Sequence, residues 1–189
     1  MKTKIKTYEL ILCALFTALI AVGAFIRFDL FSVPFTLQFL FTTLAGLLLG
    51  AKLGAISVCV YIAVGLLGIP VFTAGGGIGY IFNPNFGYII GFAVGTFATG
   101  AIANKTASPS YLRLLAANFI GLLIVYLAGV VYYYIICNYV INTPHDVMWI
   151  LLYCCLLPLP GDILICIFSA VLCKRLIPIL NKQRKTELI

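Results

Sequence analysis

The chain has 189 residues, of which 63% are hydrophobic and only 9% are charged, and its formal net charge is +7. Because a soluble domain carries about 25% charged residues, this composition argues against a soluble protein and indicates an integral membrane protein. The basic residues are spread over short turns and tails, which argues against nucleic-acid binding as the reason for the positive charge.

Long uncharged runs predict helices that cross the membrane, since one crossing needs about 20 apolar residues. Clusters of Gly, Pro and Asn divide these runs into six segments. We expect transmembrane helices at residues 8–26, 35–51, 53–69, 86–104, 112–138 and 161–176, with a very tight turn at Gly50–Gly54. The predicted fold class is therefore an all-α membrane protein with a single domain over residues 1–189. The apolar segment 147–157 is too short to cross alone and is expected to be interfacial or re-entrant.

The placement of charge predicts the orientation. With six crossings both termini lie on one side, together with the turns near residue 52 and residues 105–113. That side holds eleven basic residues: Lys2, Lys4, Lys6, Lys52, Lys105, Arg113, Lys174, Arg175, Lys182, Arg184 and Lys185. The other side holds only Arg27. Since cytoplasmic loops carry an excess of Lys and Arg, both termini are expected in the cytoplasm.

Small residues recur at four-residue spacing on two predicted helices. Gly87, Gly91 and Gly95 are expected to let that helix pack closely within the chain. Ala14 and Ala18 on the first helix fit either internal packing or contact with another protein. The seven cysteines contain no CxxC pair, so we expect them to pack helices and to bind no metal.

Most of the polar residues that could form a binding site fall in the half of the protein predicted to face the outside of the cell. Thr36 and Gln38 lie in one connection, and the segment 70–88 forms another that is glycine-rich, aromatic and uncharged. A solvated loop would be expected to carry charges, so a loop that folds back over a pocket fits the segment better than a flexible one. A nucleotide-binding loop is disfavoured because no strand, helix and lysine accompany the glycines. The candidate ligand-binding residues of the segment are Gly75, Gly76, Gly77, Tyr80, Asn83 and Tyr88.

Asp162 is the only formally charged residue in the 27-residue stretch from Val147 to Cys173. A charge at membrane depth is costly and indicates a functional site. It follows Pro160 and Gly161 and precedes an apolar helix, so it also fits a helix N-cap. Both roles are compatible, since a carboxylate has about four acceptor positions. As a ligand group it would accept hydrogen bonds from N–H donors in a small, mostly apolar pocket.

The chain resembles a known family in motifs that run along its whole length and in order. These are Pro34-Phe-Thr-Leu-Gln38, Gly50-Ala-Lys-Leu-Gly54, Gly68-Ile-Pro70, Gly75-Gly-Gly-Ile-Gly-Tyr80, Pro84, Gly87-Tyr-Ile-Ile-Gly-Phe92 and Pro158-Leu-Pro-Gly-Asp162. They are similar to those of the BioY family, the biotin-binding S components of energy-coupling-factor (ECF) vitamin transporters.

The resemblance implies a six-helix S component in a prokaryotic cell membrane that captures biotin, which is the transported ligand and not a cofactor. Transport would require a transmembrane T component and two cytoplasmic ABC-type ATPases. Asp162 would accept from the N–H groups of the ureido ring, the segment 73–80 would close the site, and Gln38, Tyr80 and Asn83 are candidates by position. Ala14 and Ala18 match the patch that docks on the T component. Many members carry a lysine where this chain has Ile165.

Two other functions remain open from the residues alone. One is a self-sufficient carrier or channel for a related small molecule, with Asp162 lining its path. The other is a membrane-embedded enzyme, which is disfavoured because the apolar core offers no second acid, base or metal cluster beside Asp162.

Overall fold

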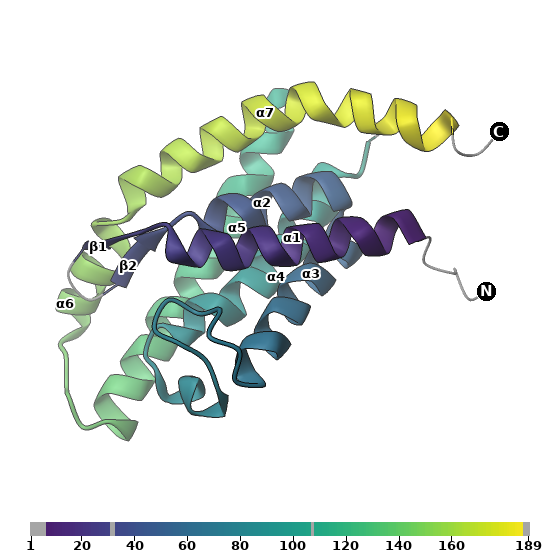
Figure 1. The fold of residues 1–189 in the computed structure, drawn as a ribbon. Helices are drawn as coiled ribbons and strands as arrows, with labels where there is room; N and C mark the ends of the chain where they lie inside the picture. The colour runs from purple at the N-terminus through teal and green to yellow at the C-terminus, as the bar shows by residue number, and fades with distance from the viewer. Residues whose placement is uncertain (1–6, 31–32, 107, 187–189) are drawn as a thin grey trace.

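A computed structural model describes residues 7–30, 33–106 and 108–186, and shows a bundle of helices with one small hairpin (Figure 1). Lys2, Lys4 and Lys6, which contribute to the predicted orientation, lie outside the described residues, as do the side chains of Lys182, Arg184 and Lys185.

Four stretches are long and apolar enough to cross a membrane. They are α1 (Thr7–Phe25), α4 (Phe86–Ala103), α5 (Tyr111–Ile135) with the π-helical turn η2 (Ile136–Val140), and the stretch Val147–Leu180. Two shorter apolar helices, α2 (Gln38–Leu49) and α3 (Ala51–Leu66), complete the bundle. The helices lie close to the six that the sequence predicts, with end shifts of a few residues except at the C-terminal end of the last one.

The segment 147–157 is helical and runs toward the last helix. Here α6 (Val147–Leu151) continues through the π-helical turn η3 (Leu152–Leu156) toward α7 (Leu159–Thr186), so the segment does not form a separate re-entrant helix. An interfacial position for it stays a prediction. Pro158 and Pro160 fall at the start of α7, where the first turn tolerates proline because its N–H groups have no helical partner.

The purely α-helical prediction is also corrected. Residues 27–36 form an antiparallel hairpin of β1 (Arg27–Leu30) and β2 (Val33–Thr36), with Arg27 opposite Thr36. The helix predicted from residue 35 therefore begins at Gln38. Polar and apolar residues alternate in Arg27-Phe-Asp-Leu30, which is the period of a strand, and β2 takes up the first residues of the predicted helix.

Two glycine features of the sequence are confirmed. Gly50 joins α2 to α3 directly with φ of +86°, a conformation that glycine adopts without steric cost. Along α4, Cβ atoms added at Gly91 and Gly95 would lie 2.9 Å from Val125 Cα and from the Gly121 carbonyl oxygen of α5. The two helices therefore pack with their backbones in close approach, as small residues allow.

The functional elements gather at one end of the bundle. Figure 1 shows the hairpin and α6 at the end opposite to the two chain termini. The α3–α4 connection (residues 67–85) contains the 3-10 helix η1 (Ile78–Phe82) and folds over the side of the bundle. The hairpin therefore lies next to the start of α7, which holds Asp162, and the α3–α4 connection covers the space beside them.

Candidate functional site: a cavity with two polar ends

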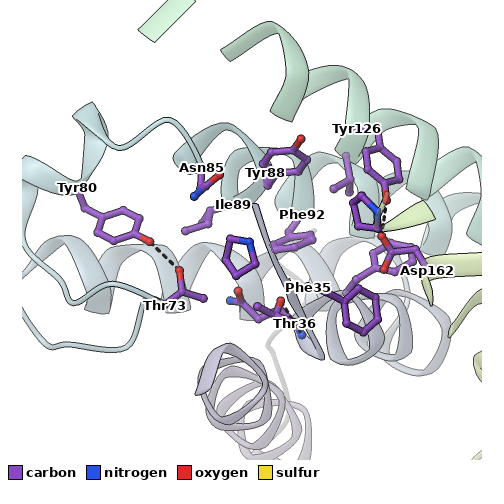
Figure 2. Close-up of a pocket in the computed structure, with 15 residues that line it drawn as sticks. Phe35, Thr36, Thr73, Tyr80, Asn85, Tyr88, Ile89, Phe92, Tyr126 and Asp162 are labelled. Atoms are coloured by element: carbon purple, nitrogen blue, oxygen red, sulfur yellow. Dashed lines mark hydrogen bonds between the residues drawn. The ribbon is translucent and has the colours of Figure 1, made fainter. Parts of the chain in front are cut away.

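One cavity with about 610 Å³ of empty volume, its mouth included, lies beneath the α3–α4 connection. Its walls come from β2, α2, the α3–α4 connection, α4, α5 and the start of α7. Figure 2 shows two hydrogen-bonded pairs at its opposite ends, Tyr126 with Asp162 and Tyr80 with Thr73.

Asp162 forms the first polar end. Its Oδ2 accepts a hydrogen bond of 2.6 Å from the hydroxyl of Tyr126 on α5. Because α7 begins at Leu159, Asp162 stands in its first turn and not at the N-cap position, and its carboxylate is shared with another helix. Negative charge is favoured in the first turn of a helix by the helix dipole. The remaining acceptor positions of the carboxylate are suited to N–H donors of a ligand.

Gly161 explains how the hairpin approaches this end. A Cβ at that position would collide with the ring of Phe35 from β2, which itself lines the cavity. Glycine is thus required for β2 to close against the start of α7.

The middle of the cavity is aromatic and apolar. Tyr88, Ile89 and Phe92 come from α4 and are all buried. The rings of Tyr88 and Tyr126 meet edge to face with their centroids 6.3 Å apart, and the Tyr88 hydroxyl donates to the Cys154 carbonyl at 2.6 Å. These contacts fix the Tyr88 ring as a rigid wall against which a flat apolar ligand can pack.

The second polar end belongs to the α3–α4 connection. The hydroxyls of Thr73 and Tyr80 share a hydrogen bond of 2.9 Å, and Arg27 of β1 donates to the Thr73 carbonyl. Asn85 follows at the start of α4 and also lines the cavity. Tyr132 of α5 donates to the Ile81 carbonyl, which ties η1 down onto the bundle. The connection is therefore held over the cavity from both the hairpin and α5.

The structure brings five of the candidate ligand-binding residues to the cavity: Thr36, Gln38, Tyr80, Tyr88 and Asp162. Gln38 is buried, and its Nε2 donates to the Tyr61 hydroxyl at 2.7 Å, so one of its two donor hydrogens is used inside the protein. Thr36 Oγ1 accepts from the backbone N–H of Gln38 at 3.4 Å.

The other four candidates do not line the cavity. Gly75 and Gly77 have φ of +114° and +101°, so they set the path of the connection. A Cβ at Gly76 would collide with the Ile69 carbonyl. Asn83 Oδ1 accepts from the backbone N–H of Asn85 at 2.9 Å and so holds its neighbour instead of facing the cavity.

Sequence reasoning missed three polar residues of the cavity: Thr73, Asn85 and Tyr126. Asn85 is two residues from the candidate Asn83. Tyr126 places a hydroxyl in an otherwise apolar helix, and this is the sequence feature that could have identified it. Ile165, where many members of the resembled family carry lysine, is buried in the apolar core and does not line the cavity.

The two alanines of the first helix lie on its exposed face. Ala14 and Ala18 are both exposed, while Cys13, Phe16 and Ile20 of the opposite face are buried. Internal packing therefore does not account for the two alanines. Within the described residues, no group of three or more His, Cys, Asp and Glu side chains is placed to hold a metal ion.

The BioY family model matches residues 1–182. The chain belongs to the BioY family. It is 42% identical to the probable biotin transporter BioY of Lysinibacillus sphaericus over 183 residues, which cover 97% of this chain and 93% of that one. It is also 42% identical to the biotin transporter BioY of Thermotoga maritima over 123 residues, covering 65% of this chain and 72% of the relative.

The fold is similar to a solved structure of the S component for biotin from an ECF-type ABC transporter. The TM-score is 0.77 at 30% identity, and the match covers 93% of this chain and 94% of the other. Membership of a transporter family and the long apolar helices identify this BioY-family chain as a multi-pass protein of the prokaryotic plasma membrane.

Proposed function

We propose that this BioY-family chain is the S component of an ECF-type ABC transporter and captures biotin in the cavity beneath the α3–α4 connection. The observation that carries the proposal is the Asp162–Tyr126 pair at one end of a cavity with an apolar, aromatic middle, in a fold shared with a biotin S component. Biotin has a ring with two N–H donors, an apolar body and an acidic tail, which suits a cavity with one acceptor end and apolar walls.

In this proposal Asp162 binds the ureido ring. The carboxylate accepts from the ring N–H groups while Tyr126 holds its other oxygen, and charge-assisted hydrogen bonds of this kind are stronger than neutral ones. Tyr88, Phe92 and Phe35 provide the surfaces for the fused rings. Gln38, Thr36 and Tyr80 complete the polar contacts, whereas Gly75, Gly76, Gly77 and Asn83 shape the connection that covers the ligand.

The proposed topology has six crossings with both termini in the cytoplasm. Lys52 at the start of α3, Lys105 after α4 and Lys174 in the second half of α7 then lie on the cytoplasmic side, and Arg27 of β1 lies outside. This distribution agrees with the excess of basic residues in cytoplasmic loops. Figure 1 supports it, because both termini lie at the end opposite to the hairpin.

Transport is proposed to need a transmembrane T component and two cytoplasmic ABC-type ATPases, because the chain has no nucleotide-binding motif of its own. Ala14 and Ala18 form the docking patch, where small exposed residues allow a partner helix to approach closely. The chain acts as a single substrate-binding domain, is not an enzyme, and uses no cofactor; biotin is its transported ligand.

Calorimetric titration of the purified chain tests this function, with riboflavin and thiamine as control vitamins. We expect saturable binding of biotin at one site and no heat of binding with either control. Failure to bind biotin, or equal binding of a control vitamin, contradicts the proposal. Uptake in proteoliposomes that contain this chain alone would instead identify a self-sufficient carrier.

A further inference from the structure

The side-chain oxygen of Asn85 is buried without a hydrogen-bond donor. No group in the described part of the chain donates to this Oδ1, although the residue lines the cavity. Burying an amide oxygen without a partner is unfavourable, so a buried unpaired group in a cavity indicates a contact that a ligand completes. A carboxamide offers a donor on one side and an acceptor on the other, and half a turn about its last bond exchanges them.

The backbone holds Asn85 firmly in this position. Its N–H donates to Asn83 Oδ1 at 2.9 Å, and its carbonyl accepts from the N–H of Tyr88 at 3.1 Å at the start of α4. Figure 2 shows the Asn85 amide between Tyr80 and Tyr88, well away from Asp162. The cavity is therefore polar at both ends, and the end opposite Asp162 is formed by Asn85, Thr73 and Tyr80.

The far end of the cavity is built from neutral groups. None of the 15 described residues that line the cavity is a lysine or an arginine. Ile165 points into the apolar core, and Arg27, which is exposed, donates to the backbone carbonyl of Thr73 instead of lining the cavity. A ligand tail at this end meets hydroxyls and one carboxamide, which recognise shape and hydrogen-bonding groups more than charge.

We propose that Asn85 is a specificity-determining residue that binds the tail of biotin by hydrogen bonding, so that the site takes biotin carboxamides as well as biotin itself. This inference rests on the proposed function. The amide N–H of Asn85 donates to a tail carboxylate. Toward a tail carboxamide, Asn85 either donates to the carbonyl or accepts from the N–H, which gives its unpaired oxygen a partner.

Calorimetric titration with biotin and with biotinamide tests the inference on the purified full-length chain. We expect the two dissociation constants to agree within about threefold, since no charge on the protein distinguishes the tails. A loss of more than about thirtyfold for biotinamide would overturn the inference while leaving biotin capture intact. No binding of biotin at all would overturn the proposed function together with the inference.

Asn85→Asp locates the tail. A carboxylate at residue 85 repels the carboxylate of biotin but not the neutral amide, so we expect at least about tenfold weaker binding of biotin and less than about threefold change for biotinamide. Equal effects on the two ligands would place the tail elsewhere. Asn142→Asp is the matched control, because Asn142 is exposed and does not line the cavity, and it should change neither constant by more than about threefold.

Arg27→Gln tests whether Arg27, instead of Asn85, binds the tail carboxylate of biotin. If Arg27 met the tail carboxylate, this change would weaken biotin selectively and spare biotinamide, which would overturn the assignment to Asn85. We expect both ligands to be affected equally, because the arginine holds the α3–α4 connection through the Thr73 carbonyl. A thermal melt of each variant checks that it is folded.

Discussion

The cavity and the exposed face of α1 are built in different ways. The cavity draws its residues from six parts of the chain, about half of them are buried, and most of its polar side chains are hydrogen-bonded within the protein. The exposed face of α1 comes from one helix, where Ala14 and Ala18 lie beside large apolar residues such as Leu15. If the cavity captures the ligand and the α1 face docks the partner, as proposed, each function is expected to fail alone when its own residues are changed.

The fixed inner face of α1 supports this separation. Thr17 Oγ1 donates to the Ser57 carbonyl of α3 at 2.9 Å, and Phe16 and Ile20 are buried against the bundle. Because α1 is anchored by these contacts, a change on its outer face should leave the cavity in place.

The largest effect is expected from bulky residues on the α1 face. Ala14→Trp or Ala18→Trp should reduce biotin uptake by the assembled transporter to background while biotin affinity changes less than about threefold, because close helix approach needs small residues. Uptake by cells and titration of the purified variant measure the two effects.

Ala116→Trp on α5 is the matched control, since Ala116 is also exposed and the substitution is the same. It should preserve uptake. If Ala14→Trp abolished biotin binding as well, the two surfaces would not be separate and the docking role would be wrong.

Asp162→Asn should weaken biotin binding at least tenfold, about 1.4 kcal/mol. The amide oxygen can still accept from Tyr126, which leaves an NH₂ group facing the N–H donors of the ring. Titration of the purified variant measures the change. Asp146→Asn, at an exposed aspartate before α6, is expected to bind like the parent chain, and equal affinity of the Asp162 variant would remove Asp162 from the site.

Gly129→Ala should displace the Tyr88 ring, which forms part of the cavity wall. An added Cβ collides with the ring of Tyr88, so we expect about fivefold weaker biotin binding and a loss of about 1–3 kcal/mol in the free energy of unfolding. Gly79→Ala provides the comparison, because nothing lies within 4 Å of a Cβ there. Similar behaviour of the two variants would mean that the Tyr88 ring is free to move.

Tyr126→Phe has the smallest expected effect. It removes the hydroxyl that donates to Asp162 and keeps the ring, so we expect a loss of about 1 kcal/mol in the free energy of unfolding. Chemical unfolding in detergent measures it, with Tyr111→Phe at the exposed start of α5 as control. An unchanged stability would show that the 2.6 Å hydrogen bond contributes little to the fold.

The sequence predicted well whatever depends on local pattern. The extents of α1, α4 and α5 follow from uncharged runs, the direct α2–α3 turn from Gly50, and the close packing of α4 within the chain from the spacing of Gly91 and Gly95. Asp162 was identifiable because one charge in an apolar stretch is costly.

The composition of the cavity could not be predicted in full, because it depends on how each helix is rotated in the bundle. A hydroxyl in an apolar helix marks Tyr126 as unusual, but its contact with Asp162 depends on the packing of α5 against α7, which the sequence of α5 does not report. Asn83 and Asn85 cannot be told apart from the sequence, whereas in the structure only Asn85 lines the cavity and Asn83 binds the Asn85 backbone. The hairpin was missed because its strands have only four residues each, and β2 contains a proline.

A structure of the chain with bound biotin tests the account most directly. We predict a ureido N–H within about 2.7–3.2 Å of an Asp162 carboxylate oxygen, the fused rings against Tyr88 and Phe92, and the tail toward Asn85. Biotin bound in the reverse direction, or outside this cavity with Asp162 bonded to Tyr126 alone, would contradict the account.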